Sequence, residues 1–136
     1  MKAQWPVTAL LLFIVGMAAR AHPISEETVT KSAWTEGAIV SFPILHCESS
    51  PTTRACYTLP VEECEASAES LVRSCLAELD SQIPDKLDEI QSGAASIQVA
   101  HCMTAAFDAA HRADVRDTVE CREAMAKWQP PKSHAK

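Results

Sequence analysis

The chain has 136 residues, six of them cysteine, and its 18 acidic residues outnumber 12 Lys and Arg for a net charge of −6. This length is suited to one domain rather than several. The acidic balance disfavours nucleic-acid binding, because contacts to a phosphate backbone require clustered Lys and Arg.

Residues 1–21 have the organisation of a secretory signal. Lys2 supplies a positive charge, Val7 to Met17 form an apolar run, and Ala19 and Ala21 are the small residues that precede a cleavage site. The apolar run is about half as long as the roughly 20 residues of a membrane-spanning helix. We therefore expect cleavage near Ala21, a secreted or periplasmic protein, and no stable membrane insertion afterwards.

Residues 22–36 show no sustained helical period. The apolar stretch 38–45 is interrupted by Pro43, which allows at most an edge strand or an extended segment. The stretch between Cys47 and Cys56 is rich in the turn-forming residues Ser, Pro and Thr. We expect an irregular N-terminal arm and a cysteine-bounded loop over 22–57.

A helical domain is predicted over 58–129. Pro60 is suited to the first turn of a helix, and apolar residues then recur every three or four positions, which predicts a helix over 60–82. Pro84 ends this helix, because the residue before a proline is disfavoured in the helical conformation. A second helix is expected over 85–110.

The second helix is predicted to be central in the bundle. Leu87, Ile90, Ala94 and Ile97 are expected on its core face, and its second half is rich in Ala. Gly93 costs about 1 kcal/mol relative to Ala inside a helix, which either weakens the helix there or marks a close helix crossing.

A third helix, capped by Asp114, is expected over 115–127. The sequence Gln129-Pro130-Pro131 ends it, and a polar tail follows over 130–136. The predicted fold class is all-α: a small bundle of about three helices, stapled by disulfides, with an irregular N-terminal arm.

Six cysteines in an exported chain predict three disulfides. A hairpin that turns near residue 84 places Cys64 opposite Cys102, but a turn near residue 112 places Cys121 opposite the same Cys102. The spacing therefore leaves the pairing ambiguous. The pairing that we predict is Cys64 with Cys102, Cys56 with Cys121, and Cys47 with Cys75.

Two features raise the hypothesis of a periplasmic metal or small-ligand carrier. Cleavage after Ala21 would make His22 the terminal residue, with imidazole and amine nitrogens that suit copper. Asp108, His111 and Asp114 recur every three residues and offer oxygen and nitrogen ligands. The alternative is a mobile arm and a solvated corner with helix-capping aspartates. We expect this alternative, and hence no bound metal or cofactor.

No catalytic constellation is apparent, and we expect no enzymatic activity. The pairs His46-Cys47 and His101-Cys102 join neighbours that point to different sides of a helix, and their thiols are expected in disulfides.

The predicted function is instead binding of another macromolecule in the cell envelope or outside the cell, as an inhibitor, immunity factor or adaptor. Four glutamates near the start of the first predicted helix would attract a basic protein partner. The alternative is that they match the helix dipole and form surface ion pairs. These residues are Glu62, Glu63, Glu65 and Glu69.

Overall fold

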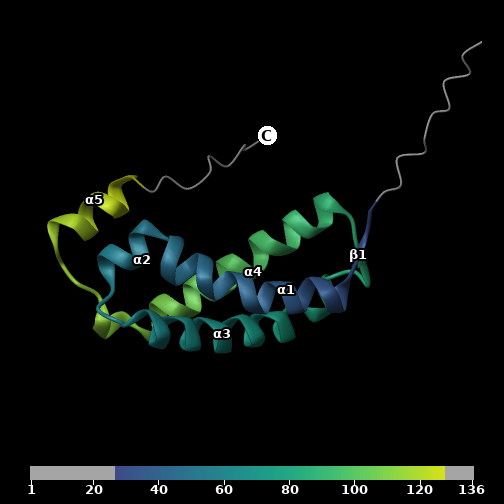
Figure 1. Cartoon of the computed structure of the whole chain (residues 1–136), viewed down its shortest axis with the longest axis horizontal. Helices are drawn as coiled ribbons and strands as arrows, with labels where there is room; N and C mark the ends of the chain where they lie inside the picture. The colour runs from purple at the N-terminus through teal and green to yellow at the C-terminus, as the bar shows by residue number, and fades with distance from the viewer. Residues whose placement is uncertain (1–26, 128–136) are drawn as a thin grey trace, which may run out of the picture.

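The computed structural model describes residues 27–127, which fold into an all-α bundle with one two-stranded sheet (Figure 1). The predicted signal and the polar tail lie outside these residues. None of the described helices is long and apolar enough to cross a membrane. In chain order the elements are β1 (Val29–Thr30), α1 (Lys31–Ile44), η1 (Leu45–Ser49), α2 (Pro51–Cys56), α3 (Val61–Glu78), η2 (Asp80–Gln82), β2 (Lys86–Leu87), α4 (Glu89–Ala110), η3 (Arg112–Asp114) and α5 (Val119–Lys127).

Helix α3 is the central element of the bundle. It packs extensively against both α1 and α4, whereas α1 and α4 contact each other only slightly. Figure 1 shows β1 at one end of the bundle and α5 at the other, where α5 packs on α2. The strands pair antiparallel, with Val29 opposite Leu87 and Thr30 opposite Lys86, so the start of α1 is tied to the start of α4.

The core lies between α1, α3 and α4. Its largest fully buried side chains are Phe107, Leu87, Val72 and Val99. On α4 the core side is formed by residues four positions apart, as expected for one helical stripe. These residues are Ala95, Val99, Met103 and Phe107.

The predicted core face of the second helix is wrong in three positions. Ile90 and Ile97 are 83% and 60% exposed, and Ala94 is exposed as well. The predicted face was counted in helical steps from Leu87, but Leu87 belongs to β2 and α4 begins only at Glu89. Because side chains repeat every two residues in a strand and every 3.6 in a helix, the buried side of Leu87 does not fix the buried side of α4.

The first residues of the last two helices are set by side-chain caps. Asp88 accepts from the Gln91 backbone N–H at 2.8 Å, and the Gln91 side chain accepts from the Asp88 N–H at 3.0 Å, which forms a capping box. Thr118 accepts from the Cys121 N–H at 3.1 Å, so α5 begins at Val119 rather than at the predicted residue 115. Asp114, the predicted cap, ends η3 instead.

The predicted irregular arm over 22–57 is wrong within the described residues, because α1, η1 and α2 occupy most of it. Pro43 lies buried in the last turn of α1. A proline there removes only one backbone donor, and the chain then continues as the π-helical turn η1. The stretch between Cys47 and Cys56 also becomes helical, with Ser50 capping α2 through the Thr53 N–H.

Three disulfides close the fold: Cys47–Cys64, Cys56–Cys121 and Cys75–Cys102, with Cα–Cα distances of 5.9, 4.6 and 5.9 Å. None of the six cysteines is free. Such a framework fits an oxidising compartment.

Of the predicted pairs, Cys56–Cys121 is present, whereas Cys64–Cys102 and Cys47–Cys75 are wrong. The connection from α3 to α4 is not a tight turn at residue 84. It contains η2 and then β2, whose pairing with β1 carries the chain beyond the end of α3 before α4 begins. Cys102 therefore reaches Cys75, and Cys64 bonds to Cys47 at the end of the unpredicted α1–η1 segment.

The Cys75–Cys102 bond is expected to carry a large part of the stability. It closes a sequence separation of 27 residues between α3 and α4. In the chain-entropy model the double variant C75A/C102A should lose about 3 to 4 kcal/mol of unfolding free energy. Urea titration at pH 7, followed by circular dichroism, measures this loss. A loss below about 1 kcal/mol would contradict the expectation.

The variant C56A/C121A is the matched control. It releases α5, which packs mainly on α2 at the end of the bundle. Hydrogen exchange should rise across Val119–Lys127 while the amides of α3 stay protected.

Candidate binding surface

One side of α4 is exposed along the helix. We call it the α4 outer face. Its residues are spaced three or four apart, so they lie on the side opposite the core stripe. All are exposed, and the two isoleucines are large apolar side chains. The face consists of Ile90, Gly93, Ala94, Ile97, His101, Thr104 and Ala105.

The α4 outer face is also free of charge. From Ile90 to Phe107 the chain contains no Asp, Glu, Lys or Arg, although the protein as a whole has a net charge of −6. A surface helix ordinarily carries charged residues on its solvent side. Exposed apolar side chains gathered on an uncharged surface are typical of the central part of a protein–protein interface.

Gly93 is not required by the fold of this chain. Its φ is not positive, and a Cβ built on it would meet nothing within 4 Å. The glycine nevertheless costs about 1 kcal/mol relative to Ala in a helix. The close helix crossing expected at this position is thus not made by the described elements, and the space beside Gly93 is open to solvent.

A second group of side chains surrounds Phe107 at the other end of α4. The rings of His46, Tyr57 and His111 lie 4.5, 5.3 and 4.4 Å from the Phe107 ring. Burial lowers the pKa of His46, opposed by the nearby Asp108 carboxylate. Burial, together with the hydrogen bond that Tyr57 donates to Asp108, raises the pKa of the Tyr57 hydroxyl. Both groups are therefore neutral at pH 7, and the cluster joins η1, α2 and α4.

Ser67, His111 and Asp114 form a hydrogen-bonded relay beside this cluster. The Ser67 Oγ lies 2.7 Å from His111 Nε2, and His111 Nδ1 lies 3.0 Å from Asp114 Oδ2. This is the order of groups that activates a serine nucleophile. Ser67 lies inside α3, however, so the N–H groups of Ser67 and Ala68 are bonded within the helix and do not stabilise an oxyanion. We interpret the relay as a structural tie between α3 and η3.

The predicted corner of Asp108, His111 and Asp114 does not converge. Asp108 accepts from Tyr57, whereas His111 and Asp114 bond to each other. Within residues 27–127 no three His, Cys, Asp or Glu side chains are arranged to hold a metal ion. His22, the other predicted ligand, lies outside the described residues.

The predicted acidic surface is divided by the structure. Glu62 and Glu63 are exposed, and Glu69 pairs with Arg73 at 2.7 Å. Glu65 is half-buried beside Glu48, and its pKa is raised by the Glu48 side chain within hydrogen-bond reach, by burial, and by the charges of Glu48 and Glu62. Binding of a basic partner by these glutamates stays a prediction.

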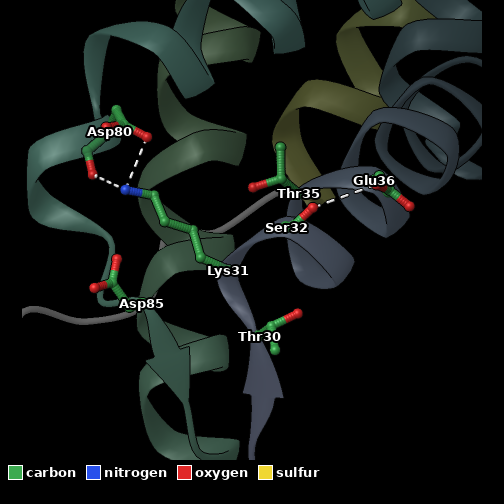
Figure 2. Close-up of a pocket in the computed structure, with 7 residues that line it drawn as sticks. All are labelled: Thr30, Lys31, Ser32, Thr35, Glu36, Asp80 and Asp85. Atoms are coloured by element: carbon green, nitrogen blue, oxygen red, sulfur yellow. Dashed lines mark hydrogen bonds and ion pairs between the residues drawn. The ribbon is translucent and has the colours of Figure 1, made fainter.

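A shallow groove lies beside the start of α1 (Figure 2). Its volume is about 610 Å³, and a neighbouring groove of about 560 Å³ shares Thr35 and Asp80 with it. Lys31 is the cation of the first groove, and its Nζ already binds the carbonyl oxygen and the carboxylate of Asp80, at 2.6 and 2.8 Å. The charge is thus satisfied within the chain, and the groove carries no recognisable chemistry.

The sequence analysis assigned Ile90, Ala94 and Ile97 of the α4 outer face to the core and predicted no binding surface on this helix. From Ile90 to Phe107 the helix lacks charge on every side, which indicates two apolar sides but does not show which of them is buried. The Ser67–His111 contact was missed, because 44 residues separate its partners.

No protein-family model, curated protein or solved structure matches this chain.

If the relay is structural, Ser67 is not nucleophilic. A fluorophosphonate probe should leave Ser67 unlabelled in mass spectrometry of the intact protein. The variant S67A should lose about 1 kcal/mol of stability, as for one hydrogen bond. Labelling of Ser67 that disappears in H111A would contradict this interpretation and indicate a nucleophile.

Glu65 is expected to destabilise the fold at neutral pH. Its pKa in the folded chain is raised above the ordinary 4.5, so its contribution is favourable below about pH 4.5 and is lost as the pH rises through the folded pKa. The variant E65Q should therefore have a higher Tm than the wild type at pH 7, and the difference should vanish below pH 4. The exposed Glu63 provides the control E63Q. Equal Tm changes in both variants would contradict the role of the Glu48–Glu65 contact.

Proposed function

We propose that this protein is an exported, non-catalytic module that binds a second protein chain through the α4 outer face. The observation that carries the proposal is the uncharged exposed surface from Ile90 to Ala105, on which Ile90 and Ile97 are 83% and 60% exposed. Burial of apolar area drives most protein association, and the two isoleucines are the large apolar side chains of this face.

The shape of the surface favours a protein partner over a small ligand. Small ligands bind in concave sites. The α4 outer face is one side of a helix, whereas the two grooves described above lie beside α1. Such a side fits a partner helix or a partner groove, which contacts residues spaced three, four and seven positions apart.

The framework behind this surface is suited to binding. Cys102 ties α4 to α3, and the capping box of Asp88 and Gln91 fixes the start of the helix. A surface held in its bound conformation loses little entropy on association.

The predicted signal over 1–21 and the three disulfides support an extracytoplasmic place of action. An inhibitor, immunity factor or adaptor of the cell envelope or the exterior fits these features. An enzymatic role receives no support from the relay, because Ser67 lies inside a helix without free oxyanion donors.

The variant I97E tests the contact surface. A buried unpaired charge opposes association strongly, so complexes containing this protein should be lost, with affinity reduced about 100-fold or more. They are measured by chemical crosslinking in the producing cells, followed by native mass spectrometry of the purified complex.

The matched control is V40E, which places the same charge at a 65% exposed position on α1. V40E should leave the complexes intact, and both variants should fold normally. Complexes that persist in I97E would exclude the α4 outer face as the contact surface.

A further inference from the structure

We infer that the second chain is another copy of this protein, docked antiparallel so that a twofold axis passes beside Ile97 of both α4 helices. This inference rests on the proposed function, since it identifies the occupant of the same face. In a twofold contact the same surface serves both partners, and each residue meets the one equally far from the axis on the other copy.

The α4 outer face is self-complementary about Ile97. The axis brings the two Ile97 side chains together and places Ile90 opposite Thr104 of the partner copy. It also places Gly93 opposite His101. His101 is exposed, and the space beside Gly93 is open, so the imidazole of each copy fills the space left by the missing side chain of the other.

The arrangement brings no like charges together at its centre. Glu89, the first residue of α4, faces the uncharged Ala105, and the stretch from Ile90 to Phe107 contains no Asp, Glu, Lys or Arg.

The charge of the chain favours a second copy on this side. With 18 acidic and 12 basic residues, two copies repel each other over most of their surfaces. The stretch from Ile90 to Phe107 lacks charge, so it lets the copies meet without that cost. The antiparallel arrangement also places opposite ends of the two helix dipoles side by side.

The size of the surface predicts a weak dimer. At 1.5 Å per residue the uncharged stretch is about 27 Å long. One helix pair of this length buries less than the roughly 1,200 to 2,000 Å² of a standard stable interface. We therefore expect a dissociation constant of about 10 to 100 μM, in the range of weak associations.

Sedimentation equilibrium of the exported, disulfide-bonded chain from about 5 μM to 1 mM tests the dimer. The wild type and V40E should pass from monomer to dimer, and I97E should stay monomeric. G93L should dissociate at least about tenfold more readily while its thermal stability does not fall, since leucine favours a helix more than glycine does. A wild type that is monomeric at 1 mM would overturn the inference.

A charge-swap pair tests the position of the axis. I97E and I97K should each be monomeric alone, and their mixture should form a heterodimer at low salt, because the two substituted side chains meet at the axis. A mixture that stays monomeric while the wild type dimerises would overturn the twofold contact at Ile97.

The failures of the two proposals are distinguishable. If the wild type is monomeric but its complexes in the producing cells are lost in I97E, the second copy is excluded and the α4 outer face still binds a different protein. If those complexes persist in I97E, both proposals fail.

Discussion

The disulfide between Cys75 and Cys102 fixes how α4 lies on the bundle. It holds Cys102 against α3 and so turns Val99 and Phe107 inward, where both are fully buried. A helix has only one side opposite its core stripe, and in α4 that side carries Ile97. The exposure of the α4 outer face is therefore a consequence of the contact between α3 and α4 and not of local irregularity.

The apolar pattern of α4 predicts that the segment is helical, but it does not show which side of the helix is buried. The helices over 60–82, 85–110 and 115–127 could be predicted because their apolar residues recur at helical spacing, with errors of a few residues where Asp88 and Thr118 supply the caps. Which apolar side of α4 is buried could not be predicted, because both sides satisfy the same period. Only the packing on α3 decides between them.

Long-range contacts limited the other predictions. Pro43 obscured α1, although a proline in the last helical turn removes a single hydrogen bond. Without α1 there was no helix to bring Cys47 to Cys64. Likewise the sequence predicts a hairpin turn near residue 84 between α3 and α4, whereas the pairing of β2 with β1 displaces α4 along α3. Each error is local in sequence, but its effect on the disulfide pattern is global.

In the proposed dimer, the distribution of charge influences which surfaces of the two copies can meet. Net negative charge keeps a small chain soluble and disfavours contact between like surfaces. In the proposed dimer, the uncharged stretch from Ile90 to Phe107 gives the two copies a side of approach that costs no like-charge repulsion. In such a contact, repulsion between the other surfaces adds to the selectivity that the contact between isoleucines provides. A partner that covers the α4 outer face must therefore also avoid repulsion from the acidic residues on the rest of the surface.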